Sequence, residues 1–395
     1  MKKLPELCNI TTGKLDANAA VENGKYPYFT CGEMPSKINE YAFNCDAILI
    51  AGNNAQGNFH VSRYCGKFNA YQRTYVLTAK ENCNLDFVYY SLKLSLVHLR
   101  KRSQGSQTKF LTMPILSDIS INDYLNQQKI TAVLSALDDK IALNRRMNAK
   151  LEQMTKRLYD HWFVQFDFPN ADGKPYKASG GKMVWNETLK REIPEGWEVK
   201  SVNDISTSYR GVGYTADDEK SAEDNDVVLI LRGNNISNNH IIYDENTVYL
   251  DKSFVSEEQK IRKYDFVMTM SSGSKEHVGK SAMFLFDSPH SYGAFCNKIT
   301  PAKYCQFFLE NYLHSEYFKK YIQVTCSGTG INNLTNEHFD KAFFAFPDNE
   351  VLESFNEKVK SIYEQIGVIE KENLRLTALR DKLLPLLING QVEIR

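Results

Sequence analysis

The chain has 395 residues, of which 42% are hydrophobic and 24% charged, so it can bury more than one core and is not a disordered protein. Lys plus Arg and Asp plus Glu are balanced at 48 each. This balance excludes a protein that grips nucleic acid through bulk positive charge, and any such affinity requires a local basic surface or a basic partner.

The eight cysteines never fall in C-x2-C spacing, so the sequence predicts neither a zinc site nor a thioredoxin-like motif. The first residues lack the apolar core of a signal peptide, and no stretch approaches the roughly 18 apolar residues of a spanning helix. We therefore expect a cytoplasmic protein without a metal site.

Residues 1–122 mix short β-runs such as Asp46–Ile50 with a helical stretch over Leu85–Arg102, which predicts an α+β globule. Its loops are polar and punctuated by glycine, and they carry amides and cations that suit base-edge readout, although the same residue types are typical of ordinary turns. The candidates for DNA contact here are Asn53, Asn54, Gln56, Gln72, Arg73, Arg100, Lys101, Arg102, Gln104, Gln107 and Lys109.

Residues 123–168 carry a long helical pattern with apolar residues at heptad a and d positions, the seam along which two helices wind around each other. One asparagine also falls on the seam, where a polar side chain costs stability but fixes register. The seam residues of this helix are Ile130, Leu134, Leu137, Ile141, Asn148, Leu151 and Leu158.

Residues 169–196 are rich in Gly, Lys and Pro and are predicted to form a linker. Residues 197–347 then repeat the first globule faintly: Arg210-Gly211 resembles Thr12-Gly13, and Asp265–Thr269 resembles Asp46–Ile50. Phe307–Val324 is the helical stretch of this second globule.

Polar loops recur at equivalent places in the second globule. The candidates for DNA contact there are Arg232, Asn234, Asn235, Ser272, Ser274, Lys275, Thr329, Asn332 and Asn333. Ser274–Ser281 also has the tail of a nucleotide-binding loop. Its first glycine position holds Ser274, however, and the residues that follow favour a strand instead of the required helix, so nucleotide binding is not expected.

Residues 348–395 carry a second long helix whose seam coincides with that of the first when Phe355 is laid over Ile130. One interpretation of this coincidence is that two amphipathic helices in separate domains are alike by chance. Antiparallel pairing instead gives a pseudo-twofold rod with a globule at each end, which suits a duplex DNA target. The seam residues are Phe355, Val359, Ile362, Ile366, Asn373, Leu376 and Leu383.

No catalytic constellation is visible: the histidines are scattered, and the methyltransferase, hydrolase and metalloprotease motifs that we sought are missing. Two alternatives to DNA recognition remain open. One is a non-catalytic coiled-coil scaffold that links two protein-binding domains, and the other is an enzyme with an unrecognised active site.

Four stretches carry a family resemblance. Leu158–Pro169 looks like the end of the central helical region of specificity (S) subunits of type I restriction–modification enzymes. Gly173–Val184 and Ile193–Trp197 look like their inter-repeat segment, and Arg380–Val392 looks like their C-terminal helix end. The globule–helix–globule–helix order is similar to that family's architecture over essentially the whole chain.

This resemblance implies two target-recognition domains held apart by an antiparallel pair of helices. Each domain would read one half of a split, asymmetric DNA site with a fixed spacer. Two methyltransferase (M) subunits and two restriction (R) subunits would bind S-adenosylmethionine, ATP and Mg²⁺, and this chain would hold no cofactor, metal or catalytic residue. The apolar ends Trp162-Phe163 and Leu383–Ile388 either recruit the methyltransferase or pack the helices against the globules.

Overall fold

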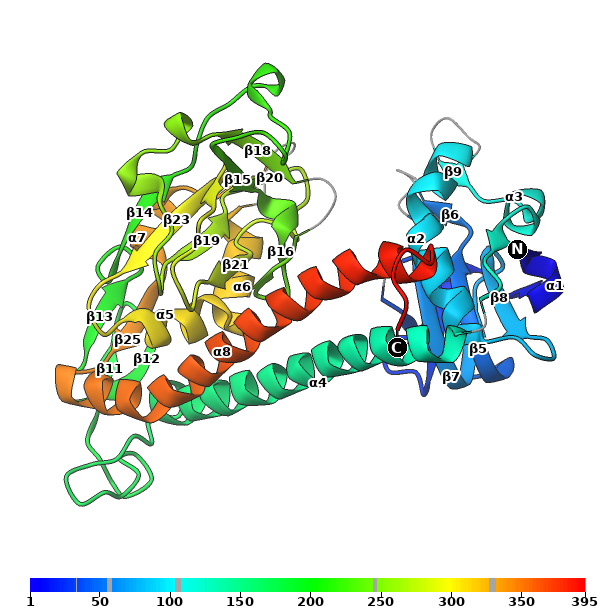
Figure 1. The fold of residues 1–395 in the computed structure, drawn as a ribbon. Helices are drawn as coiled ribbons and strands as arrows, with labels where there is room; N and C mark the ends of the chain where they lie inside the picture. Colours follow the sequence, from blue (N-terminus) through cyan, green and yellow to red (C-terminus); the bar gives the residue numbers. More distant parts are fainter. Residues whose placement is uncertain are drawn as a thin grey trace. The chain divides into compact units, whose positions relative to one another are not determined.

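The computed structural model describes residues 1–32, 34–54, 59–103, 108–124, 126–243, 247–326 and 332–394. The chain forms two compact units: the first comprises Met1–Leu143 and Glu372–Arg395, and the second comprises Asn144–Lys371. The long helices α4 (Gln127–Tyr159) and α8 (Asn349–Ile388) each contribute one end to each unit (Figure 1). Each expected globule is thus extended by part of the helix pair.

The first unit is built on a six-stranded sheet in the order β2-β8-β5-β7-β3-β4, in which only β3 and β7 pair in parallel. The central strand β5 is buried over Ala47–Ala51 and contributes to a hydrophobic cluster on each face of the sheet, which explains its unbroken apolar run. The elements are β1 (Lys2–Lys3), α1 (Leu4–Leu7), β2 (Cys8–Thr12), β3 (Tyr26–Phe29), β4 (Ser36–Ile38), β5 (Phe43–Ala51), β6 (Asn53–Asn54), β7 (Val61–Ala70), β8 (Thr74–Ala79), α2 (Leu85–Arg102), β9 (Lys109–Phe110), α3 (Met113–Ser117) and β10 (Ser120–Ile121).

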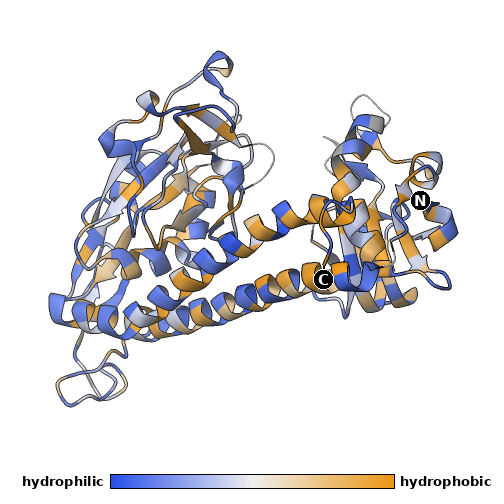
Figure 2. Ribbon diagram, viewed as in Figure 1, coloured by the Kyte–Doolittle hydropathy of each residue, from blue (hydrophilic) through white to orange (hydrophobic). Residues whose placement is uncertain are grey.

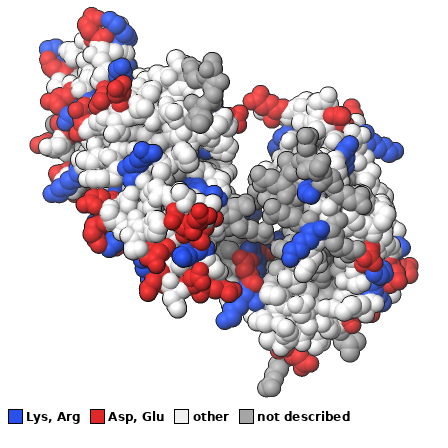
Figure 3. Space-filling view, turned by 90° about the horizontal axis from the view of Figure 1, so that it is seen from above, with Lys and Arg blue, Asp and Glu red and all other residues white. Residues whose placement is uncertain are grey.

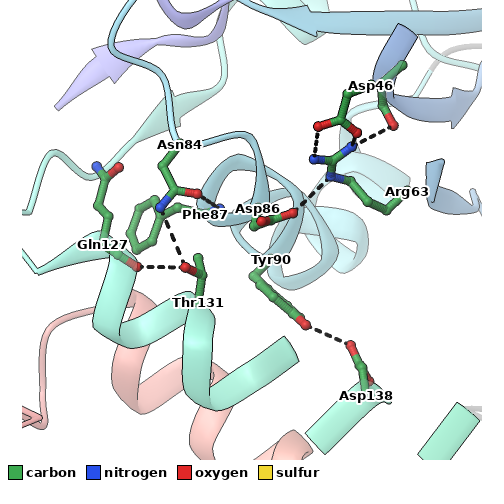
Figure 4. Close-up of polar contacts among 10 residues, drawn as sticks. Asp46, Arg63, Asn84, Asp86, Phe87, Tyr90, Gln127, Thr131 and Asp138 are labelled. Carbon is green, nitrogen blue, oxygen red and sulfur yellow. Dashed lines mark hydrogen bonds and ion pairs between the residues drawn. The ribbon is translucent and has the colours of Figure 1, made fainter. Parts of the chain in front are cut away.

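Polar side chains tie helix α2 to the sheet and to α4 (Figure 4). Arg63 of β7 forms ion pairs with Asp46 of β5 and, at 2.9 Å, with Asp86 of α2. From α2, the Tyr90 phenol donates a hydrogen bond to Asp138 of α4 at 3.0 Å. The first sheet and its part of the helix pair therefore form one packed body.

The second unit repeats this sheet in two pieces, β14-β23-β19-β21 and β18-β15-β22. The break occurs because the counterpart of β7 is interrupted between Met283 and Ser291. The elements are β13 (Glu198–Ser201), β14 (Ser206–Arg210), β15 (Val227–Leu231), β16 (Ile236–Ser237), β17 (His240–Ile241), β18 (Val248–Asp251), β19 (Phe266–Thr269), β20 (Ser271–Ser272), β21 (Ser281–Met283), β22 (Ser291–Tyr292), β23 (Cys296–Pro301), α5 (Gln306–Leu313), α6 (Glu316–Thr325), β24 (Asn332–Asn333), α7 (Asn336–Lys341) and β25 (Phe343–Phe346).

Two glycines hold the same place in the two units, as the sequence repeat predicted. The Gly13 amide donates to the Thr74 carbonyl at 3.3 Å, and the Gly211 amide donates to the Cys296 carbonyl at 3.1 Å. A Cβ atom at Gly13 would lie 1.8 Å from the carbonyl oxygen of Ala70, so the chains approach too closely for any other residue.

One part of the predicted repeat is out of register. Ala51 and Thr269 each end a central strand, one residue before the short strands β6 and β20, so they correspond to each other. Overlaying Asp46 on Asp265 is therefore wrong by one residue. In a strand such a slip exchanges the two faces, and the apolar runs alone did not reveal it because they are buried on both sides.

The segment expected as a linker contains a hairpin, in which β11 (Met183–Asn186) pairs with β12 (Arg191–Pro194). The ring of Phe168 stacks on Tyr176 with centroids 4.7 Å apart and on Trp197 with centroids 5.0 Å apart. Aromatic stacking thus orders a segment whose Gly, Lys and Pro content predicted a loop.

Within each unit α4 and α8 run antiparallel, and apolar positions recur along both helices (Figure 2). In the first unit Ile130 and Leu134 pack in one core with Leu387 and Ile388; in the second, Phe355 and Ile366 pack with the other end of α4. Every residue of the predicted seam is buried or half-buried: Ile130, Leu134, Leu137, Ile141, Asn148, Leu151, Leu158, Phe355, Val359, Ile362, Ile366, Asn373, Leu376 and Leu383.

Trp162 and Phe163 are only 3% and 5% exposed and lie in the aromatic core of the second unit, where both rings contact Phe355. They follow α4 in a π-helical turn, Asp160–Val164. Their apolar surface is buried inside the unit. Of the two alternatives, packing of the helix against the globule is therefore correct, and recruitment of a partner by these two side chains is wrong. In the described part of the chain, no helix combines the length and apolarity that crossing a membrane requires.

Candidate nucleic-acid interface

Three predicted loops of the first unit meet at one end of its sheet. Strand β6 pairs with β9, so that Asn53 lies opposite Phe110 and Asn54 opposite Lys109. The Gly52 amide donates to the carbonyl of Arg73 at 2.8 Å, which joins the turn between β7 and β8 to the same edge. We call β6, β9 and residues 71–74 the first loop cluster.

The side chains of the first loop cluster differ in how firmly they are held. The Arg73 guanidinium lies 5.1 Å from the centroid of the Phe110 ring, close enough for a cation–π contact. Gln72 is exposed and its amide nitrogen donates to Asp16 at 3.4 Å. The Asn53 side-chain oxygen is buried and has no hydrogen-bond partner among the described residues.

The remaining candidates of the first unit belong to the segment after α2. Lys109 is half-buried in β9, and Lys101 is exposed on the last turn of α2. Gln56, Gln104 and Gln107 lie outside the described residues, as do the side chains of Arg100 and Arg102.

The second unit brings equivalent loops together. Strand β20 pairs with β24, so that Ser271 lies opposite Asn333 and Ser272 opposite Asn332. The Ser271 hydroxyl also donates to the Asn333 side-chain oxygen at 2.6 Å. The Met270 amide donates to the carbonyl of Phe295 at 2.8 Å. We call β20, β24 and residues 293–296 the second loop cluster.

The other candidates of the second unit divide into structural and exposed groups. Asn235 is fully buried, and its side chain accepts from the Arg232 amide at 2.9 Å and donates to the Ile242 carbonyl at 3.0 Å, so it shapes the turn. The neighbouring Asn234 is exposed, as are Ser274 and Lys275. Thr329 lies outside the described residues.

Sequence reasoning missed Phe295. Its ring is 68% exposed, in a turn that joins the second loop cluster. The turn has the position in its unit that residues 71–74 have in theirs, because Phe295 and Arg73 accept equivalent main-chain hydrogen bonds. A search for amides and cations passes over a phenylalanine; only the repeat of the turn could have drawn attention to it.

Neither unit shows a strongly basic face in the view of Figure 3. On the face shown in Figure 3, Lys and Arg are interspersed with Asp and Glu in each unit, with no broad field of one sign. The interface is thus suited to specific contacts at particular side chains, with strong electrostatic attraction left to a partner.

Within the described ranges, no group of three or more His, Cys, Asp or Glu side chains is placed to hold a metal ion. The second unit has a cavity of about 300 Å³ lined by Glu152, His240, Glu310, His314 and Glu370 among others. His240 bridges Glu152 and Glu370 at 3.3 Å each, so both of its ring nitrogens have a carboxylate partner. These hydrogen bonds raise the pKa of His240 to about 10, which favours its charged form. The segment Ser274–Ser281 does not lead into the helix that a nucleotide-binding loop requires, because strand β21 begins at Ser281.

Comparisons with known proteins identify relatives. Residues 1–153 match the model of the type I restriction modification DNA specificity domain. The EcoDI specificity subunit of Escherichia coli is 38% identical over 156 residues, which are 40% of this chain and 34% of that protein. The MjaIX specificity subunit of Methanocaldococcus jannaschii is 24% identical over 322 residues, covering 80% of this chain and 71% of its own.

The fold has a counterpart among solved structures. The crystal structure of a type I restriction–modification S subunit from M. genitalium superposes with a TM-score of 0.55 at 15% identity, covering 98% of this chain and 95% of that one. The expected α+β fold is thereby confirmed, and the family-model match supports the predicted resemblance over residues 1–153. In the curated relatives of 32–38% identity, the matched segment spans only 34–38% of their length.

Proposed function

We propose that this chain, whose residues 1–153 belong to the type I restriction modification DNA specificity domain family, is the DNA specificity subunit of a type I restriction–modification complex. Each unit reads one half of a bipartite, asymmetric site, and the paired helices α4 and α8 set the length of the unread spacer. The complex works in the cytoplasm, where its DNA target lies.

The observation that carries this proposal is the duplication of the loop clusters. In each unit a two-residue strand after the central strand pairs with a two-residue strand after the domain's helices. The main-chain hydrogen bond beside each of these strand pairs is also repeated. The Leu111 amide donates to the Gly52 carbonyl at 2.9 Å, and the Leu334 amide donates to the Met270 carbonyl at 2.7 Å. Two copies of one frame with different side chains suit a target of two unlike halves.

The chemistry falls to partner subunits in this proposal. Two M subunits bind S-adenosylmethionine and methylate a flipped adenine, and two R subunits use ATP and Mg²⁺ for cleavage. A docking surface for the M subunit is offered by the part of α4 in the second unit, which exposes Met147 and Met154, seven residues apart, on one face of the helix. The exposed fractions of these two side chains are 37% and 56%.

The test is co-expression with the methyltransferase subunit encoded nearby, in a host without adenine methylation, followed by genome-wide mapping of N6-methyladenine. We expect a split motif with a fixed spacer that disappears when this chain is omitted. Complex formation is followed in the same cells by affinity purification of the methyltransferase subunit.

Two results would contradict the proposal. Methylation that continues unchanged without this chain would show that it does not supply specificity. Failure to form any complex with the methyltransferase subunit would favour the non-catalytic scaffold that links two protein-binding domains.

A further inference from the structure

The turns of residues 71–74 and 293–296 hold the same position in the two units. In each turn the fourth amide donates to the first carbonyl at 2.8 Å, Thr74 to Tyr71 and Cys296 to Gly293. Each first residue also donates from its amide to a neighbouring strand at 2.9 Å, Tyr71 to β3 and Gly293 to β15. The third residue of each turn, Arg73 or Phe295, is therefore carried on an equivalent rigid support.

A main-chain hydrogen bond joins the third residue of each turn to the start of the short strand in the same loop cluster. Its carbonyl accepts the amide of the residue that precedes the short strand, Gly52 or Met270, at 2.8 Å in both cases. At Gly52 the approach is so close that a Cβ atom would lie 2.2 Å from the Arg73 carbonyl oxygen. The main chain thus fixes where both side chains start.

The two side chains differ in chemistry but share an exposed setting. Arg73 is exposed, and the Phe110 ring beneath its guanidinium limits the directions the side chain can take. Phe295 presents 68% of its surface to solvent. An apolar ring held out on a rigid turn gains free energy when a partner covers it.

We propose that Arg73 and Phe295 are corresponding specificity-determining residues, one for each half-site. Arg73 donates two hydrogen bonds to the O6 and N7 acceptors of a guanine in the half-site read by the first unit. Phe295 packs against the methyl group of a thymine in the half-site read by the second. This inference rests on the proposed function and deepens it.

The experiment uses the complex with the methyltransferase subunit and duplex libraries in which one half-site at a time is randomised, with initial methylation rates as the readout. Arg73→Ala is expected to lower discrimination at one G·C position of its half-site by about 10- to 100-fold and to leave the other half-site unchanged. Phe295→Ala is expected to lower discrimination at one T·A position of the other half-site by about 10-fold. Phe295→Leu, which keeps an apolar group, should restore part of that loss.

Control variants separate a specific loss of base discrimination from a general loss of folding or activity. Lys37→Ala and Trp185→Ala remove exposed side chains on other elements of the two units and should change neither half-site. Phe295→Asn keeps a residue suited to turns and provides a second test if the alanine variant does not fold.

Three outcomes are distinguished by these variants. If the wild-type complex methylates no split motif, the proposed function fails. If it does, and the folded Arg73→Ala and Phe295→Ala or Phe295→Asn complexes retain wild-type preferences, the inference is overturned while the proposed function stands. A loss of discrimination in both half-sites from one substitution would also overturn it.

Discussion

The phenol of Tyr90 on α2 donates a hydrogen bond to the carboxylate of Asp138 on α4 at 3.0 Å. The second unit has a corresponding contact, in which the tyrosine lies on the long helix and its partner on the helix of the globule. Asp138 also pairs with Arg380 of α8 at 2.9 Å. When Phe355 is laid over Ile130, Asp138 falls on Tyr363, and it is there that the Asn311 amide donates to the Tyr363 phenol at 3.1 Å. In both units one polar residue on a long helix thus anchors a helix of the globule, α2 in the first unit and α5 in the second.

Removing this anchor should loosen the first unit. Asp138→Ala leaves the largely buried Tyr90 hydroxyl without its acceptor and leaves Arg380 with Asp381 as its remaining carboxylate, so we expect the free energy of unfolding to fall by about 2 kcal/mol. Urea titration followed by circular dichroism measures it. Asp139→Ala, at the exposed neighbouring position, is the control, and an equal effect from both variants would contradict the anchor.

Asn148 is a polar residue that the seam tolerates at a cost. It is 4% exposed, its amide nitrogen donates to the Ile366 carbonyl at 3.5 Å, and its side-chain oxygen has no hydrogen-bond partner among the described residues. Replacing it with leucine removes an unsatisfied buried oxygen, so Asn148→Leu should raise the free energy of unfolding by about 1 kcal/mol. A lower thermal midpoint than wild type would mean that this site needs its amide; exposed Arg145→Leu is the matched control.

His240 should make the second unit less stable as the pH rises. Hydrogen bonds to Glu152 and Glu370 raise its pKa to about 10 in the folded state, above the ordinary value of 6.5. The stabilisation is therefore complete below about pH 6.5 while both carboxylates are ionised, and it is lost as the pH rises toward 10. Urea midpoints of wild type and His240→Gln should differ most near pH 6 and converge near pH 10.

The control for this titration is His277→Gln, which removes an exposed histidine from the same unit. The same measurements between pH 6 and pH 10 on this variant give the effect of removing an imidazole that does not bridge two carboxylates. A constant difference for His240→Gln over that range would show that the ion pairs do not stabilise the fold.

The helix pair should act as the spacer ruler. We expect one heptad inserted into both α4 and α8, after Leu143 and after Lys371, to lengthen the tolerated DNA spacer by up to about 3 base pairs, since seven residues add about 10 Å of helix. Methylation of duplexes with graded spacers measures it. Insertion into one helix alone is the control and should abolish methylation, and an unchanged spacer after the double insertion would reject the ruler.

Strong local patterns predicted much of the fold. The expected helix over Leu85–Arg102 is α2, and the heptad positions of both long helices are buried or half-buried, because an apolar stripe must be covered. The stretch Phe307–Val324 forms two helices, because Ser315 begins α6 by accepting the Phe318 amide at 3.1 Å.

Tertiary contacts decided what local patterns did not. The stacking of Phe168 between Tyr176 and Trp197 orders the expected linker, although these residues are distant in sequence. The loops of the candidate site could be predicted from their polar residues, but their convergence depends on main-chain pairing across each sheet. Phe295 carried no signal of its own because an isolated phenylalanine more often indicates a core residue.

The two loop clusters are held mainly by main-chain amides and carbonyls, and this has a consequence for how such a protein changes over generations. Substitutions at most positions of the short strands leave the frame intact, so a new base preference can arise without a new fold. Each frame lies within its own unit. Under the proposed function, one half of the recognised sequence would then be free to be exchanged while the other is inherited, and a small number of interchangeable halves would yield a far larger number of targets.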